Sequence, residues 1–154
     1  MHTKPLTFQL PAPVAGSDWS YMPSQTDQTV IMAITATLTT DATVANRYPG
    51  LKMTDQSGLV YFAMNASEPQ AASLAVTYSY AESAPNQSGI TAVTGQALAA
   101  PLPQIWLQPG DTIGSDTLGL DASDQWSAIV IRFYTGERWK RLQWELQVAK
   151  ELTS

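Results

Sequence analysis

A chain of 154 residues is long enough to bury a hydrophobic core within one domain, without a disulfide or a structural metal. The absence of cysteine excludes disulfides, thiolate chemistry and Cys-ligated zinc, and a formal net charge of −5 argues against the basic surface that nucleic-acid binding requires. Charged residues make up 14% of the chain, well below the roughly 25% of an average soluble protein, which is typical of subunits inside an assembly and equally of secreted β-proteins.

The N-terminal residues do not resemble a targeting segment. The chain begins Met-His-Thr-Lys and lacks the apolar stretch of a signal peptide. No run of about 18 apolar residues occurs, so we expect no membrane-spanning helix. We therefore expect a protein that is made and used without Sec-type export and without a membrane.

The clearest strand prediction covers residues 30–38. Val30, Ile34 and Leu38 belong to an apolar series at every second position, and threonines fill most positions between them. The predicted strands are residues 6–10, 19–22, 30–38, 51–54, 59–64, 73–80, 104–108 and 128–133. Turn-forming Pro-Gly and Ser-Gly pairs separate several of them. Short strands at this spacing predict an antiparallel sandwich or barrel of about eight strands, with residues 1–136 as one β-domain.

Residues 82–101 interrupt this regular spacing with small and polar residues. Two interpretations stay open. The segment is either a mobile loop or arm that becomes ordered on contact with a neighbour, or a surface loop without a role in binding.

The C-terminus has helical periodicity. Residues 137–152 contain neither Gly nor Pro, and their apolar residues recur at the spacing of a helix. On a helical wheel these residues cover roughly 220°, more than double the stripe of about 100° that lies on one surface. The five that we expect to bind a partner are Trp139, Leu142, Trp144, Leu146 and Val148.

Two arrangements would cover so wide an apolar surface. In the first, the helix lies in a groove of its own domain and is contacted on both sides. In the second, one apolar arc packs on the sandwich and the other meets a second subunit, with Trp144 as an interface anchor. We favour the second, in which residues 137–154 form a docking element.

Charge is distributed unevenly along the chain. Up to residue 131 there are three basic and ten acidic residues, giving −7, whereas residues 132–154 contain five basic and three acidic residues, giving +2. The C-terminal segment therefore differs electrostatically from the β-domain.

Catalytic patterns are absent from the sequence. The only histidine is His2, and no phosphate-binding loop, dinucleotide fingerprint or G-x-S-x-G elbow occurs. We predict no catalytic residue, no cofactor and no metal site. A hydrolase with a carboxylate pair that no motif reveals is a further alternative.

Two further binding chemistries stay open. Four aspartates near predicted turns could bind Ca²⁺, although Asp is also common in turns because it bonds its own backbone; they are Asp111, Asp116, Asp121 and Asp124. Three tryptophans could stack on sugars in a carbohydrate-binding or receptor-binding module, although strand tryptophans more often fill a core; they are Trp19, Trp106 and Trp126.

Residues 18–134 contain a series of strand and turn motifs: an alternating Thr/Ala-rich strand that leads to Asn-Arg, an Asp-x-x-Gly turn, an "LP…PG" stretch and an Asp-Gln-x-Ser sequence before the last strand. The residues of these motifs are Asn46 and Arg47, Asp55 and Gly58, Leu102, Pro103, Pro109 and Gly110, and Asp124, Gln125 and Ser127. In these motifs the chain resembles the small virion proteins of tailed bacteriophages.

This resemblance implies a jelly-roll-like sandwich without enzymatic activity, used in the capsid, neck or tail of a virion that assembles in the bacterial host cytoplasm. Its partners would be other virion proteins, namely capsid, portal or tail subunits, together with further copies of itself. The C-terminal helix lies outside the resemblance. Arg47 is one of three cations among residues 1–131, so it either forms an ion pair that holds a loop or contacts a neighbouring subunit.

Overall fold

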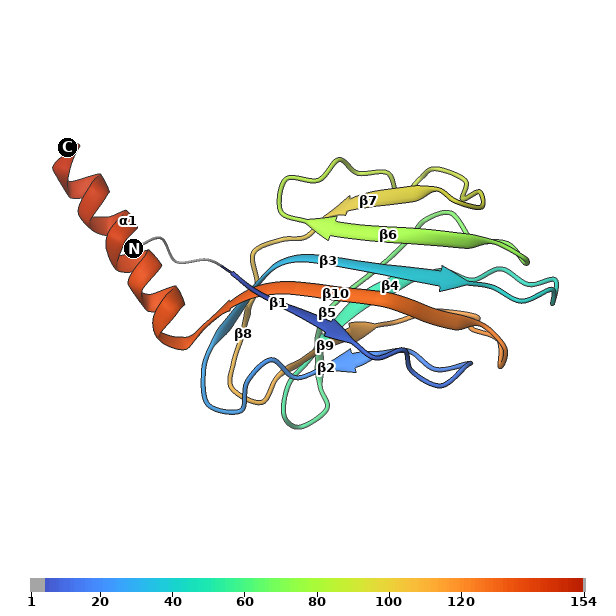
Figure 1. Ribbon diagram of the computed structural model, residues 1–154, viewed down its shortest axis with the longest axis horizontal. Helices are drawn as coiled ribbons and strands as arrows, with labels where there is room; N and C mark the ends of the chain where they lie inside the picture. Colours follow the sequence, from blue (N-terminus) through green and yellow to red (C-terminus); the bar gives the residue numbers. More distant parts are fainter. Residues whose placement is uncertain (1–4, 154) are drawn as a thin grey trace.

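The computed structural model describes the backbone of residues 5–153 and their side chains, except those of residues 137–142. These residues form ten strands and one helix (Figure 1). The strands are β1 (Leu6–Leu10), β2 (Ser20–Tyr21), β3 (Thr29–Thr39), β4 (Gly50–Thr54), β5 (Val60–Asn65), β6 (Ala75–Ala81), β7 (Ala97–Pro101), β8 (Trp106–Leu107), β9 (Thr112–Ser115) and β10 (Gln125–Thr135). The helix, α1, spans Gly136–Leu152.

The strands form two sheets. One contains six strands in the order β1-β10-β3-β6-β7, with β8 also paired to β3, and the other contains four in the order β2-β9-β4-β5. Within the described residues the strand pairs are antiparallel, except that β6 and β7 run parallel. The prediction of an all-β sandwich with one C-terminal helix is confirmed.

Strands β3 and β10 form the centre of the larger sheet because one face of each is consistently apolar. Ile34 lies opposite Tyr80 on β6 and Ile131 on β10, and all three side chains are buried. Alternating apolar residues point to the same face of a strand, which is why period-2 spacing located both strands. Their buried faces meet residues of the smaller sheet such as Leu51 and Met53, and together they form the core.

The segment 82–101 is more ordered than predicted. Its last five residues form β7, which extends the larger sheet beside β6. The preceding loop is held on its own chain, because the Gln87 backbone N–H donates to the Ala99 carbonyl at 2.8 Å and the Ala99 N–H donates to Gln87 Oε1 at 2.9 Å. The description of residues 82–101 as one loop or arm is therefore wrong for its C-terminal part.

Strand β9 was also absent from the prediction. It contains Gly114, which has no side chain and lies close to the segment that leads into β2. A Cβ added at Gly114 would be 2.5 Å from the carbonyl oxygen of Trp19. Glycine is depleted in strands, so a four-residue segment containing one gives little strand signal. The glycine is present because the two backbones approach closely.

Candidate interaction surface

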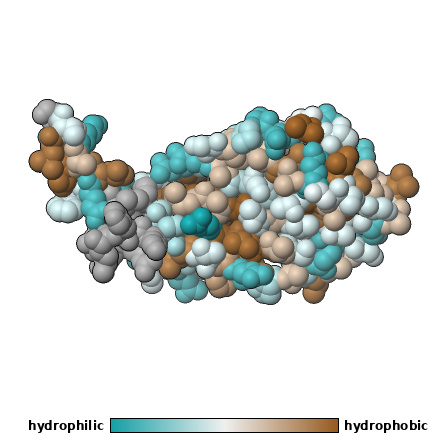
Figure 2. Space-filling model, turned by 45° about the horizontal axis from the view of Figure 1, so that its top comes forward, coloured by the Kyte–Doolittle hydropathy of each residue, from teal (hydrophilic) through white to brown (hydrophobic). Residues whose placement is uncertain are grey.

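Helix α1 exposes large hydrophobic side chains over its C-terminal half. Trp144, Leu146 and Leu152 are 65%, 61% and 82% exposed, and Val148 is partly exposed. No residue from 143 to 153 is buried. Figure 1 shows α1 extending away from the sandwich, and Figure 2 shows hydrophobic residues on its surface.

The sandwich does not cover this half of the helix. In the described part of the chain, the main contacts of α1 with the strands are made to β3 and β10. The arrangement with the helix in a groove is therefore wrong for residues 143–153, as is the part of the second arrangement in which one arc packs on the sandwich. The contact of Trp144 with a second subunit stays a prediction. The side chains of Trp139 and Leu142, two of the predicted interface residues, lie outside the described part of the chain.

Gly136 turns the chain from β10 into α1. Its φ of 52° lies in the left-handed region, and its N–H donates to the carbonyl of Gln28 at 3.0 Å. A Cβ at this position would be 2.9 Å from Oδ1 of Asp27, so the Asp27 carboxylate lies beside the first turn of the helix. A negative charge there is favoured by the helix dipole. Because Thr135 makes no side-chain capping bond, Gly136 and Asp27 are the features that define this junction.

The predicted interface residue Arg47 has no exposed surface. Its guanidinium lies between two carboxylates, with Nε 2.8 Å from Asp124 Oδ2 and Nη2 2.7 Å from Asp41 Oδ1. Nη1 donates to the carbonyls of Thr43 and Ala45 at 2.8 and 2.7 Å. Every guanidinium nitrogen thus has a partner within the chain. The ion-pair interpretation is confirmed, and the proposed subunit contact for Arg47 is wrong because the side chain is buried.

The pKa values of this cluster favour its charged state. Burial alone would raise the pKa of Asp124, but hydrogen bonds from Arg47 and from the backbone N–H groups of Asp121 and Asp41 outweigh burial and hold that pKa below the ordinary value of an aspartate. The hydrogen bond to Asp124 correspondingly raises the pKa of Arg47. The cluster fixes the loop after β3 against the turn before β10.

The four aspartates considered for Ca²⁺ are engaged in three local structures, with Asp121 and Asp124 together in one turn. Asp111 accepts hydrogen bonds from the Tyr61 hydroxyl and the Gln108 N–H at 3.0 and 2.9 Å, while Asp116 pairs with Lys52 at 3.4 Å. In the described part of the chain, no three acidic, His or Cys side chains are grouped so that they could hold a metal ion. Turn and ion-pair chemistry accounts for these residues.

Two of the three tryptophans considered for sugar stacking lie inside the sandwich. Trp19 and Trp126 are 3% and 2% exposed. Trp126 packs edge-on against Tyr78 with ring centroids 6.2 Å apart, and its Nε1 donates to Asp18 Oδ1 at 3.2 Å. Trp106 is partly exposed in the short strand β8. For Trp19 and Trp126 the sugar-platform hypothesis is wrong, because their rings fill the core.

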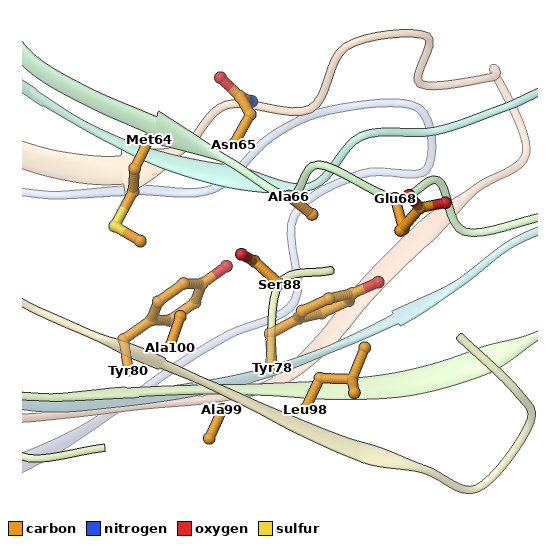
Figure 3. Close-up of a pocket in the computed structure, with 10 residues that line it drawn as sticks. All are labelled: Met64, Asn65, Ala66, Glu68, Tyr78, Tyr80, Ser88, Leu98, Ala99 and Ala100. Carbon is orange, nitrogen blue, oxygen red and sulfur yellow. The ribbon is translucent and has the colours of Figure 1, made fainter. Parts of the chain in front are cut away.

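A small pocket lies between the sheets near the ends of β5 and β7 (Figure 3). The rings of Tyr78 and Tyr80 project from β6 toward the side of Met64 and Ala66. The space available to the centre of a water molecule is ≈ 20 Å³, enough for about one water. Burial raises the pKa of both tyrosines, so both hydroxyls remain protonated at neutral pH. The pocket is a packing gap, too small for an organic ligand.

No helix in the described residues combines the length and the apolar character needed to span a bilayer.

Comparison with known proteins adds little. No family model and no curated protein matches the chain. Among solved structures, the chain is similar to one in the structure of infectious bursal disease virus Gx strain, at 6% identity and a TM-score of 0.24. The match covers 85% of this chain and 35% of that one. A likeness this weak carries no argument about fold or function.

Proposed function

We propose that the protein is a non-enzymatic structural subunit of a tailed-bacteriophage virion and that it binds another virion protein through α1. The observation that carries the proposal is the exposure of Trp144, Leu146 and Leu152 on a helix that leaves its own domain. The particle type comes from the sequence resemblance, and the mode of binding comes from the helix.

An exposed helix of this kind gains stability when a partner covers it. Most of the stability of a helix in a protein comes from packing of an apolar face. No residue of α1 from 143 onward is buried, so this half of the helix lacks that contribution. Burying one large aliphatic side chain contributes about 1.5–3 kcal/mol, and Trp is enriched among interface residues that dominate affinity. A groove that covers Trp144 and Leu146 would therefore stabilise both the helix and the complex.

The order of the strands supports a jelly-roll sandwich. If β7 and β8 are taken as additions to one connection, the sheets read β1-β10-β3-β6 and β2-β9-β4-β5. The chain then alternates between sheets at each step except the hairpin of β4 and β5. We infer that these eight strands form two interlocked Greek keys, an architecture used by viral capsid domains and also by lectins and cupins. Because one fold serves several functions, this order supports the proposal without deciding it.

The test uses purified capsid, portal and tail proteins encoded beside the gene, titrated with the full-length chain by calorimetry. In the test variant, Trp144→Lys and Leu146→Lys place charges on the exposed helix. The control is Val44→Lys, since Val44 is 96% exposed on a loop of the sandwich. We expect one protein to bind, the helix variant to weaken binding by about 30-fold or more, as for a hot spot of about 2 kcal/mol, and the control to bind normally. Binding by none of these proteins, or equal binding by the helix variant, would contradict the proposal.

A further inference from the structure

Strand β5 forms an edge of the smaller sheet and has the composition of an interface. It pairs with β4 on one side, and in the described part of the chain no strand pairs with its other side. Its sequence, Val-Tyr-Phe-Ala-Met-Asn, contains no charged residue and no proline. Exposed edges are usually protected by Lys, Pro or a covering segment because they pair readily with other strands. Here Val60 and Tyr61 are 46% and 43% exposed.

The hydrogen-bonding pattern identifies which peptide groups face outward. The Ala66 N–H donates to the Pro49 carbonyl, and Met64 and Phe62 are the partners of Leu51 and Met53. Because hydrogen-bonded and non-bonded pairs alternate in an antiparallel ladder, Ala66, Met64 and Phe62 bond to β4. The peptide groups of Ala63 and Asn65 therefore point away from β4, toward the open edge.

We propose that β5 pairs antiparallel with β5 of a second copy, about a two-fold axis through Ala63. This inference is independent of the helix and of the virion proposal. With Ala63 opposite Ala63 of the second copy, Phe62 lies opposite Met64 and Tyr61 lies opposite Asn65. The outward N–H of Ala63 then donates to the Ala63 carbonyl of the second copy, and its own carbonyl accepts from the Ala63 N–H of that copy. The register shift in the pairing with β4 falls between Met53 and Thr54, at the Val60 end of β5, so the central residues stay regular.

The chemistry of the strand favours a second copy as the occupant. Each chain carries a net charge of −5, so two copies repel each other over most of their surface. Strand β5 has no charged residue, and two copies of it can pair without charge repulsion between the two strands. Phe62 and Met64 are partly buried against the core, and in the pair each would cover the other across the axis. Contacts between a thioether and an aromatic ring are favourable. The paired edges would join two four-stranded sheets into one, with an isologous interface.

Cross-linking tests this register directly, because the chain has no cysteine of its own. In the full chain, Ala63→Cys places two thiols on facing residues whose Cα atoms are about 5.5 Å apart in such a pair, within the range for a disulfide. The matched control is Val60→Cys, an exposed residue of the same strand whose partner would be Ala66. Both variants also carry Trp144→Lys and Leu146→Lys, so the helix cannot drive association. We expect the Ala63→Cys variant to form disulfide dimers faster than the Val60→Cys variant by on the order of tenfold.

Sedimentation gives the second readout. Ala63→Pro removes an N–H that does not bond to β4, a position where an edge strand tolerates proline. We expect the parent chain to form dimers as its concentration rises and the proline variant to sediment as a monomer. Equal cross-linking in the two cysteine variants, or a parent chain that stays monomeric at all concentrations, would overturn the proposal. Neither result would contradict the proposal that α1 binds a virion protein.

Discussion

Arg47 and Asp124 form a buried ion pair in which both side chains have 0% exposure. The guanidinium binds both carboxylate oxygens, with Nε to Oδ2 at 2.8 Å and Nη2 to Oδ1 at 3.1 Å, across 77 residues of sequence. Asp124 also accepts the backbone N–H groups of Asp41 and Asp121 at 2.9 and 2.8 Å. The pair therefore joins the segment after β3 to the turn before β10 at one end of the sandwich.

Removing the cation should strongly destabilise the fold. Arg47→Met leaves the Asp124 carboxylate buried without its counterion, and breaking a buried pair in this way costs about 3–5 kcal/mol. Urea unfolding followed by tryptophan fluorescence measures the loss. Lys52→Met is the control, because its pair with Asp116 is 39% and 32% exposed at 3.4 Å and exposed pairs contribute about 0–1 kcal/mol. Equal losses of unfolding free energy in the two variants would show that burial of the Arg47–Asp124 pair does not increase its contribution to stability.

Stability should also depend on pH through Asp124. A carboxyl whose pKa is lower in the folded state than in the unfolded state contributes stability above its unfolded pKa, and this contribution is lost as pH falls through the folded value. For Asp124 the folded pKa is lowered from its ordinary value, so the wild-type chain should lose this contribution as pH falls through the acidic range. In Arg47→Met the chief hydrogen-bond donor that lowers the pKa is gone while burial still raises it, so protonation of Asp124 favours the folded variant. We expect the difference in unfolding free energy between wild type and variant, measured by urea unfolding with circular dichroism, to narrow as the pH is lowered; a difference that stays constant with pH would refute this explanation.

The junction of β10 and α1 should not tolerate a side chain at residue 136. Gly136→Ala places a Cβ 2.9 Å from the Asp27 carboxylate and requires the left-handed conformation, which costs about 1–2 kcal/mol for other residues. Gly95→Ala is the control, since Gly95 has a φ of 78° but no atom within 4 Å of an added Cβ. Hydrogen exchange should show faster exchange in the first turns of α1 for Gly136→Ala alone. Adding Asp27→Ala should restore part of the protection if the clash is the cause.

Gln70 should be important for stability because it is a buried side chain with three partners. Its Nε2 donates to the carbonyls of Leu38 and Leu74 at 2.8 and 3.1 Å, and its Oε1 accepts from the Tyr78 hydroxyl at 2.9 Å. Gln70→Leu leaves that hydroxyl without its partner, at a cost of about 1–3 kcal/mol. In thermal unfolding, Tyr78→Phe introduced into Gln70→Leu should recover part of the loss. If the double variant instead loses the sum of the stabilities lost by the two single variants, Gln70 and Tyr78 contribute to stability independently.

The sequence predicted the elements whose signal is local. β3 and β10 alternate because one face of each is buried, and α1 is free of Gly after its first residue. β7 was missed because Ala-Leu-Ala-Ala-Pro lacks β-branched and aromatic residues, and its place depends on parallel pairing with β6. Scarcity of cations indicated an ion pair for Arg47, but Asp124 is distant in sequence and could not be identified as its partner. The direction of α1 depends on Gly136 and Asp27, a contact that no periodicity reveals.

The most direct test of the account is the protein content of purified virions. Particles would be isolated on a density gradient from a bacterial strain carrying the genome that encodes the chain, and the chain would be quantified by mass spectrometry relative to the most abundant particle protein. We predict that the wild-type chain is present in a fixed ratio and that the chain with Trp144→Lys and Leu146→Lys is lost from particles while it remains folded in the lysate. Absence of the wild-type chain from particles would contradict the proposed function.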